Sequence, residues 1–162
     1  GLLGFVENYR RLTRIPTPAC TSVAVDEIFS DLRKLFPDSF IHFAATHRGA
    51  TLYIDRAQIE QVLINLIKNA KESCGQNTAP QIEVELEQVP GKVCSLTVRD
   101  NGEGILPEVI DKVFVPFFTT KPSGSGIGLS LCKQIMNLHG GTITVSSEIG
   151  KGSCFTLMFP GR

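Results

Sequence analysis

Two asparagines, Asn65 and Asn69, stand one helical turn apart in the segment 56–74. At about 100° per residue, they share a face of the predicted helix with Gln61 and Glu72. Asparagine is a poor helix former, so two of them inside one helix indicate a task other than helix stability. A carboxamide oxygen is a hard neutral ligand that suits Mg²⁺, an ion that nucleotide phosphates also hold. The pattern predicts either a metal–nucleotide site or simply the polar edge of a helix.

A carboxylate follows the predicted strand 93–99. Asp100 begins the run Asp-Asn-Gly-Glu-Gly, in which Gly102 and Gly104 allow close backbone approach to a ligand. A carboxylate at a strand end can accept a hydrogen bond from an exocyclic amine such as that of adenine. The same residue types are typical of an ordinary turn, so the motif alone leaves both interpretations open.

A second glycine group, Gly124, Gly126 and Gly128, stands at the start of the predicted helix 127–138. Backbone N–H groups at a helix start bind phosphate, aided by the helix dipole. The group is not a Walker A loop, because no Gly-Lys-Ser/Thr follows it, and not a dinucleotide fingerprint, because a loop precedes it. The motif therefore indicates a phosphate site or a flexible loop.

The elements that must position these residues follow from hydrophobic periodicity. Helices are expected at 26–36, 56–74 and 127–138, and strands at 41–44, 51–54, 81–88, 93–99, 142–146 and 153–159. The first two strands flank a turn at Gly49, and Asp55 is expected to cap the second helix. Irregular alternation with adjacent hairpins predicts an α/β fold: a two-layer α/β sandwich with a mixed sheet and helices packed on one face.

Length and composition narrow the class of protein. A chain of 162 residues suits one domain, and 16 basic against 16 acidic residues argue against a generally basic nucleic-acid binder. Five cysteines without a Cys-x-x-C pair leave zinc unsupported and favour free thiols in a reducing cytoplasm. No apolar run approaches the roughly 20 residues that span a bilayer, and the start lacks the pattern of a signal peptide. A cytoplasmic location is expected.

Taken in order, five motifs resemble the ATP-binding catalytic domain of sensor histidine kinases, within the gyrase, chaperone, histidine-kinase and mismatch-repair ATPase superfamily. These motifs are Asn65–Ala70, Asp100–Gly104, Phe114–Lys121, Gly124–Leu129 and Gly150–Phe155. The compact third motif is similar to that of the nitrogen-regulation type of kinase. The resemblance covers about residues 21–160 and implies a Bergerat-type fold with an ATP lid.

The resemblance implies ATP and Mg²⁺ as cofactors and a role for each motif. Asn69 would coordinate Mg²⁺, Asn65 would contact the metal shell or phosphates, and Asp100 would accept the adenine amine. Gly102 and Gly104 would let the backbone close on the base. The remaining nucleotide contacts implied are Phe118, Lys121, Gly124, Gly126, Ile127, Gly128 and Leu129, with Phe114, Phe117 and Phe118 anchoring a lid at 119–125.

Position 65 separates branches of this superfamily. The gyrase and chaperone branches carry a glutamate there as the base that activates water, whereas the Asn65 amide does not accept a proton near neutral pH. The resemblance therefore implies phosphoryl transfer to an acceptor, with Asn65 and Lys121 as catalytic residues. Many membrane-receptor kinases have Lys or Arg where this sequence has Glu72. Lys121 would therefore have to supply the positive charge that contacts the phosphates.

The acceptor is expected outside this sequence. Of the three histidines, His42, His47 and His139, none is followed by the family's acceptor motif, and all three are expected to be structural. Residues 1–20 are interpreted as the end of an upstream dimerisation and phosphoacceptor hairpin with its linker, and 21–162 as the catalytic domain. The partners implied are the phosphoacceptor and dimerisation domain of the same kinase and a response regulator, and no nucleic acid is expected. The full-length protein is expected to be a homodimer and could carry a membrane anchor. The alternatives are an anti-sigma-type serine kinase or a non-catalytic nucleotide-binding module.

Overall fold

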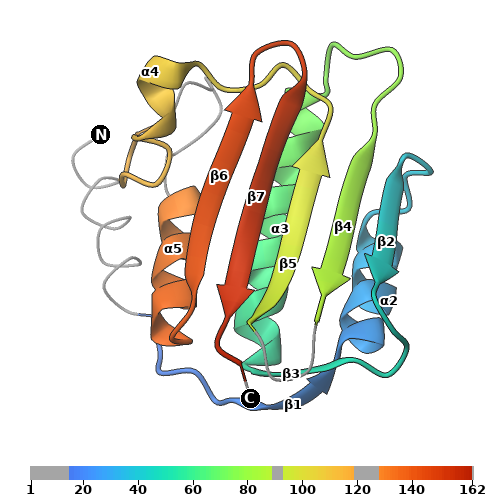
Figure 1. Ribbon diagram of the computed structural model, residues 1–162, viewed down its shortest axis with the longest axis vertical. Coiled ribbons are helices and arrows are strands. Elements are labelled where there is room, and N and C mark those ends of the chain that lie inside the picture. Colours follow the sequence, from blue (N-terminus) through green and yellow to red (C-terminus); the bar gives the residue numbers. More distant parts are fainter. Residues whose placement is uncertain (1–14, 89–92, 119–127, 162) are drawn as a thin grey trace.

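The computed structural model describes residues 15–88, 93–118 and 128–161. A five-stranded sheet runs in the order β2-β4-β5-β7-β6 (Figure 1). Its strands are β2 (Ile41–Ala45), β4 (Ile82–Glu87), β5 (Cys94–Asp100), β7 (Gly152–Phe159) and β6 (Thr142–Glu148). The β2–β4 pair is parallel and the other three pairs are antiparallel, which confirms the predicted mixed sheet.

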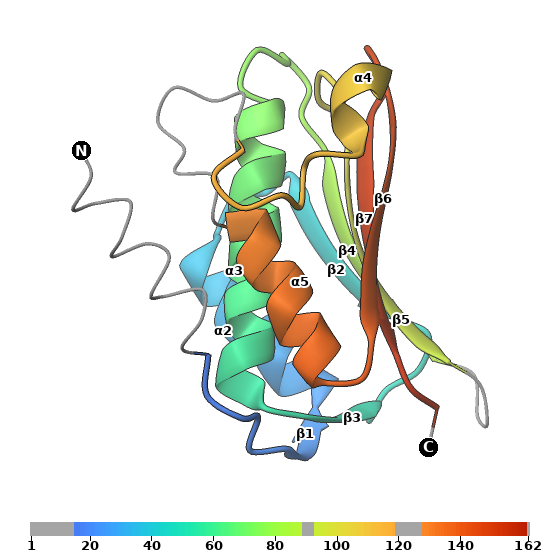
Figure 2. The same ribbon diagram turned by 90° about the vertical axis from the view of Figure 1, so that its left-hand side faces the viewer.

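Helices α2 (Val25–Leu35), α3 (Arg56–Ser73) and α5 (Gly128–Leu138) cover one face of this sheet, as Figure 2 shows. The core lies between the two layers, and along β4 the residues Ile82, Val84 and Leu86 alternate into it. The two-layer α/β sandwich is confirmed.

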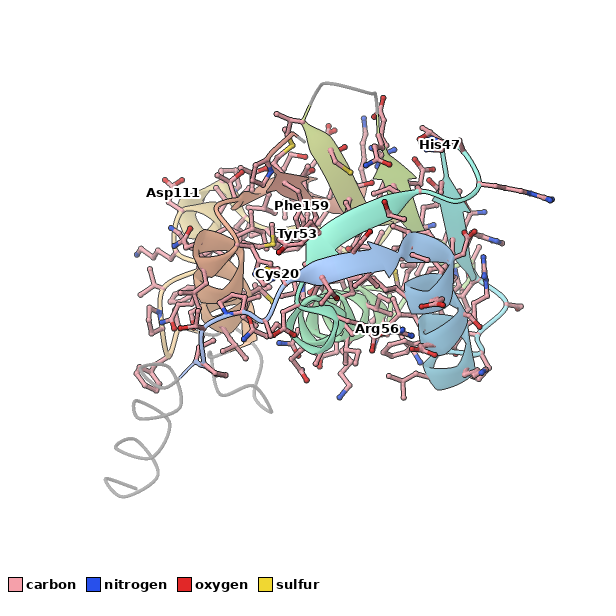
Figure 3. The ribbon with its side chains drawn as sticks, turned by 90° about the horizontal axis from the view of Figure 1, so that it is seen from below. Cys20, His47, Tyr53, Arg56, Asp111 and Phe159 are labelled. Carbon is pink, nitrogen blue, oxygen red and sulfur yellow. The ribbon has the colours of Figure 1, made fainter. Side chains whose placement is uncertain are left out.

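Helix α3 is the central element of the helical layer. Its apolar stripe is buried throughout; the stripe consists of Ile59, Leu63, Leu66, Ile67 and Ala70. Asp55 caps the helix, because its Oδ1 accepts the Gln58 N–H at 3.1 Å, as predicted. At the same end, Arg56, which is labelled in Figure 3, forms ion pairs with Glu27 and Asp31 of α2 at 2.9 and 2.7 Å.

The strands on either side of Gly49 do not pair with each other. Strand β3 (Thr51–Ile54) pairs instead with β1 (Thr21–Ala24) in a separate antiparallel sheet, and β2 joins the edge of the main sheet beside β4. The Thr46 N–H continues the β2–β4 pairing onto the Leu86 carbonyl, so the chain leaves β2 along the sheet edge and does not turn back. Strand β1 and the short helix α4 (Pro107–Ile110) were not predicted.

Helix α5 ends at Leu138, as predicted, and Gly140 and Gly141 follow it. Gly140 adopts φ +73°, and the Gly141 N–H donates to the Met136 carbonyl at 2.9 Å. All five cysteines are free thiols, as expected. Among the described residues, no helix combines the length and the apolar character needed to cross a membrane.

Candidate functional site

Asp100 is the last residue of β5 and lies on the helix-facing side of the sheet. Its Cα partners are Ile82 on β4 and Ser153 on β7, and directly opposed residues point to the same face. Only 4% of Asp100 is exposed, and its Oδ1 accepts the Gly102 N–H at 2.9 Å. The carboxylate is therefore buried and held in a fixed orientation beside the helical layer.

Asn65 lies where α3 meets α5. Its Nδ2 donates to the Gly128 carbonyl at 3.4 Å and approaches Cys132 Sγ at 3.8 Å, while its Oδ1 accepts from Gln61 Nε2 at 3.0 Å. The first residue of α5, which belongs to the second glycine group, is thus joined directly to the asparagine motif. Asn69 follows one turn further along α3 and is half-buried.

The far end of α3 reaches the loop that follows Asp100. The Ser73 carbonyl accepts the Glu103 N–H at 3.1 Å. A Cβ at Gly102 would lie 2.5 Å from that same carbonyl oxygen, so only glycine fits there. Three of the predicted groups therefore lie along one helix: Asn65 beside Gly128, Asn69 next, and the Asp100 loop at its end.

Two further glycines bring the Asp100 loop against the β6–β7 hairpin. Gly104 adopts φ +81°, and a Cβ there would lie 2.5 Å from the Glu148 carbonyl oxygen. Gly152 adopts φ +128°, and a Cβ there would overlap the Asp100 carbonyl. The glycines around Asp100 thus have a packing role of their own, next to the role in base binding that the resemblance implies.

The described part of the phenylalanine-rich third motif, residues 114–118, contacts the core through Phe114. Its ring meets Phe155 of β7 edge-on at 6.2 Å, and Lys133 Nζ of α5 lies 5.8 Å from its centroid. Phe117 adopts φ +68°, and Phe118 is half-buried, with its N–H donating to the Val115 carbonyl at 3.2 Å. Phe114 thus connects this motif to both β7 and α5.

Several predicted nucleotide contacts lie outside the described residues. These are Lys121, Gly124, Gly126 and Ile127, together with the expected lid at 119–125. Gly128 and Leu129 are described, and Leu129 packs against the core as a partly buried residue. The structure thus describes the metal-and-adenine half of the predicted site and the start of its phosphate half.

Sequence reasoning missed Asn101, which holds the neighbouring loop. Its Oδ1 accepts the Gln81 N–H at 2.8 Å, its Nδ2 donates to the Ala79 carbonyl at 3.0 Å, and its own carbonyl accepts from Asn77 Nδ2 at 2.8 Å. The signal was present, since an asparagine between a strand end and a glycine favours side-chain bonds to nearby backbone. Asn101 fixes the position of the residues on both sides of it.

The surface of α3 carries two lysines near the asparagines. Lys71 Nζ forms an ion pair with Asp38 Oδ2 at 3.0 Å. Lys68 is exposed. Glu72, which departs from the family pattern, is also exposed.

The two thiols closest to the site remain protonated. Burial raises the pKa of Cys132 to about 12. Burial and the nearby Asp100 charge raise the pKa of Cys74, whose Sγ donates to Asn101 Oδ1 at 3.6 Å. Since the thiolate is the nucleophile, neither cysteine offers nucleophilic chemistry at neutral pH.

His139 has the structural role expected of it. Its Nδ1 donates to the Ile135 carbonyl at 2.8 Å, and its Nε2 accepts the Asp55 N–H at 3.1 Å. This pair of bonds requires the neutral ring with its proton on Nδ1. The end of α5 is thereby tied to the start of α3.

Comparison with known proteins agrees with this geometry. A family model described as "Histidine kinase-, DNA gyrase B-, and HSP90-like ATPase" matches residues 54–162. Sensor histidine kinase ZraS of Escherichia coli (strain K12) is 38% identical over 120 residues, which are 74% of this chain and 25% of that protein. The chain thus spans about a quarter of the length of this relative.

Solved structures give the same result. The catalytic domain of histidine kinase ThkA superposes with a TM-score of 0.76 at 32% identity, over 87% of this chain and 95% of that one. Histidine kinase ThkA in complex with response regulator protein TrrA superposes with a TM-score of 0.79 at 27% identity, over 99% and 47% of the respective chains. The chain therefore belongs to the histidine kinase-, DNA gyrase B- and HSP90-like ATPase family, as an ATP-binding catalytic domain of the sensor histidine kinase type.

Proposed function

We propose that this domain binds Mg-ATP and delivers the γ-phosphoryl group to a histidine on an upstream phosphoacceptor domain of the full-length protein. The observation that carries the proposal is the arrangement along α3, where Asn65, Asn69 and the Asp100 loop lie in order. Such a reaction needs mainly positioning and neutralisation of charge, which side chains held at fixed places can provide.

Asp100 would recognise the adenine amine. Its carboxylate is buried at a strand end, and the Gly102 N–H fixes the orientation of Oδ1. A charged acceptor in such a site binds an amine more strongly than a neutral acceptor does. Gly102 and Gly104 would bring the loop backbone close to the base.

The asparagines would hold the metal ion. Mg²⁺ is usually bound through one or two protein oxygens together with substrate phosphates, and the half-buried Asn69 and Asn65 on one face of α3 fit this donor set. Bound Mg²⁺ would neutralise the negative charge of the phosphates. The N–H groups at Gly124, Gly126 and Gly128, with Lys121, would contact the phosphates, and Phe118, Ile127 and Leu129 would line the nucleotide.

Asn65 would favour transfer over hydrolysis. Its carboxamide is oriented by Gln61 and by the Gly128 carbonyl, and an amide cannot take a proton from water near neutral pH. Water bound next to it would therefore not be activated. Asn65 and Lys121 would act by positioning and charge, not as bases.

The proposal extends to the domains and partners of the full-length protein. Residues 1–20 would be the end of an upstream dimerisation hairpin with its linker, 21–162 the catalytic domain, and the full-length protein a cytoplasmic or membrane-anchored homodimer. A response regulator would take the phosphoryl group onward; the solved ThkA complex, which contains one, supports this partner. Nothing observed here favours the serine-kinase alternative.

Calorimetric titration with ATP, with and without Mg²⁺, tests the proposal. Asp100→Asn removes the charge at nearly constant shape and should weaken ATP binding about tenfold to a hundredfold. Glu103→Gln is the matched control, because it removes an exposed carboxylate from the same loop and should leave the affinity unchanged. Asn69→Ala should abolish the gain in affinity that Mg²⁺ gives. Equal affinity of Asp100→Asn and the unaltered protein would overturn the adenine assignment.

A further inference from the structure

Ser147, near the end of β6, joins three segments through one hydroxyl group. Its Oγ accepts the Ile105 N–H at 2.7 Å and donates to the Gly152 carbonyl at 3.0 Å. The Ser153 hydroxyl lies 2.9 Å from it. Because the single proton of Ser147 is directed to Gly152, Ser153 donates to Ser147.

Ser147 belongs to the same row of residues as Asp100. Across the sheet, Asp100 on β5 is opposite Ser153 on β7, which is opposite Ser147 on β6. Opposed residues share a face, so all three side chains lie on the helix-facing side. Asp100 and Ser153 are 4% and 5% exposed, and Ser147 is half-buried at the rim.

The loop after Asp100 is therefore fastened at both ends. At its start, Asp100 belongs to the β5–β7 ladder; at its far end, the Ile105 N–H is held by Ser147. Between them, the Glu103 carbonyl accepts the Gly150 N–H at 2.9 Å. The side chain of Ser147 thus sets where the loop ends relative to the carboxylate at its start.

We propose that Ser147 is a positioning residue for adenine recognition. By binding the Ile105 N–H, Ser147 fixes the loop backbone at Gly102 and Gly104 relative to Asp100. The two glycines and the carboxylate can then contact the same adenine base. The inference rests on the proposed binding of adenine by Asp100 and assigns a role to a residue that does not touch the nucleotide.

The test compares ATP with inosine triphosphate, in which a carbonyl replaces the amine that Asp100 would bind. In the 162-residue chain, Ser147→Ala should weaken ATP binding about fivefold to tenfold and leave inosine triphosphate binding within about twofold. The preference for ATP should therefore fall. Ser147→Thr keeps the hydroxyl and should restore the preference.

Ser146→Ala is the matched control. Ser146 is the neighbouring serine, but it lies opposite Cys154 on the outer face of the sheet, so its loss should change neither affinity. Ser147→Cys nearly keeps the shape and only weakens the hydrogen bonds, so it provides the test if Ser147→Ala fails to fold; its preference should fall as well.

The outcomes separate the two proposals. If Ser147→Ala lowered both affinities equally, or left the preference intact, Ser147 would not position the adenine loop and the inference would be overturned alone. If the unaltered chain bound ATP and inosine triphosphate equally, the assignment of Asp100 to the adenine amine would be overturned, and this inference with it.

Discussion

At the scale of single residues, the glycines around Asp100 are explained by space as well as by backbone angle. Gly104 and Gly150 both have φ near +80°, at +81° and +80°. A Cβ at Gly104 would lie 2.5 Å from the Glu148 carbonyl oxygen, whereas a Cβ at Gly150 would meet nothing within 4 Å. The two positions therefore separate the cost of the backbone angle from the cost of the contact.

Substitution of each glycine by alanine measures these two costs. Gly150→Ala should lower the free energy of unfolding by roughly 1–2 kcal/mol, the cost of a left-handed residue with a Cβ. Gly104→Ala should lower it by about 1–3 kcal/mol more, because the Cβ must also displace backbone. Urea denaturation of both variants gives the comparison. Equal losses would mean that the loop can move away from the hairpin freely.

At the scale of elements, the start of α3 is a junction of three segments. Asp55 Oδ1 caps the helix at the Gln58 N–H, and Asp55 Oδ2 accepts the Ala19 N–H at 3.0 Å. Gln58 Nε2 donates to the Pro16 carbonyl at 2.9 Å, and His139 of α5 accepts the Asp55 N–H. The segment before β1 is thus attached to the helix that carries the asparagine motif.

The pH dependence of stability should report this junction. The hydrogen bond from Ala19, more than the one from Gln58, holds the pKa of Asp55 below its ordinary value of 3.8. A carboxyl group whose pKa is lowered by folding stabilises the protein fully above its unfolded pKa, and this contribution is lost as the pH falls through the folded value. Near neutral pH, the free energy of unfolding of the unaltered protein should therefore be about 1 kcal/mol higher than that of Asp55→Ala. This difference should shrink below about pH 4.

Denaturation curves from about pH 2.5 to 7 would measure that difference. Asp55→Asn, which cannot ionise, keeps the size of the side chain and should lack this part of the pH dependence. A difference that stayed constant down to the lowest pH would show that the charge of Asp55 contributes nothing to the cap.

How far the sequence predicts the elements depends on how local their causes are. The bounds of α3 and its Asp55 cap follow from residues within or next to one helix, and these predictions are confirmed. The pairing of β3 with β1 depends on contacts between short strands distant in the sequence, and two four-residue strands carry too little pattern to specify it. Asp100 and the asparagines belong to sequence motifs and could be predicted. Ser147 could not, because it binds the backbone N–H of Ile105 and the backbone carbonyl of Gly152, and backbone groups leave no pattern in the sequence.

At the scale of the whole molecule, the three histidines lie away from the arrangement along α3. His42 belongs to β2, which forms the sheet edge opposite β6 (Figure 1). His47, labelled in Figure 3, belongs to the loop after β2. His139 follows the C-terminal end of α5, an 11-residue helix, which places it about 16 Å from Gly128. Both ring nitrogens of His139 are also engaged in hydrogen bonds.

The chain should consequently bind ATP without phosphorylating itself. A γ-phosphoryl group held beside Asn69 and Gly128 cannot reach a histidine at the opposite sheet edge, and transfer requires the reacting atoms to approach to about 3–3.5 Å. Incubation of the 162-residue chain with γ-labelled ATP and Mg²⁺, followed by detection of base-stable, acid-labile phosphate, should give no labelled protein. The full-length protein with Asp100→Asn keeps its acceptor histidine and binds ATP poorly itself. When it is added to the 162-residue chain, label should appear on the full-length protein only. Label on the 162-residue chain that disappeared in His42→Gln, His47→Gln or His139→Gln would show that one of these histidines is an acceptor, contrary to the geometry described above.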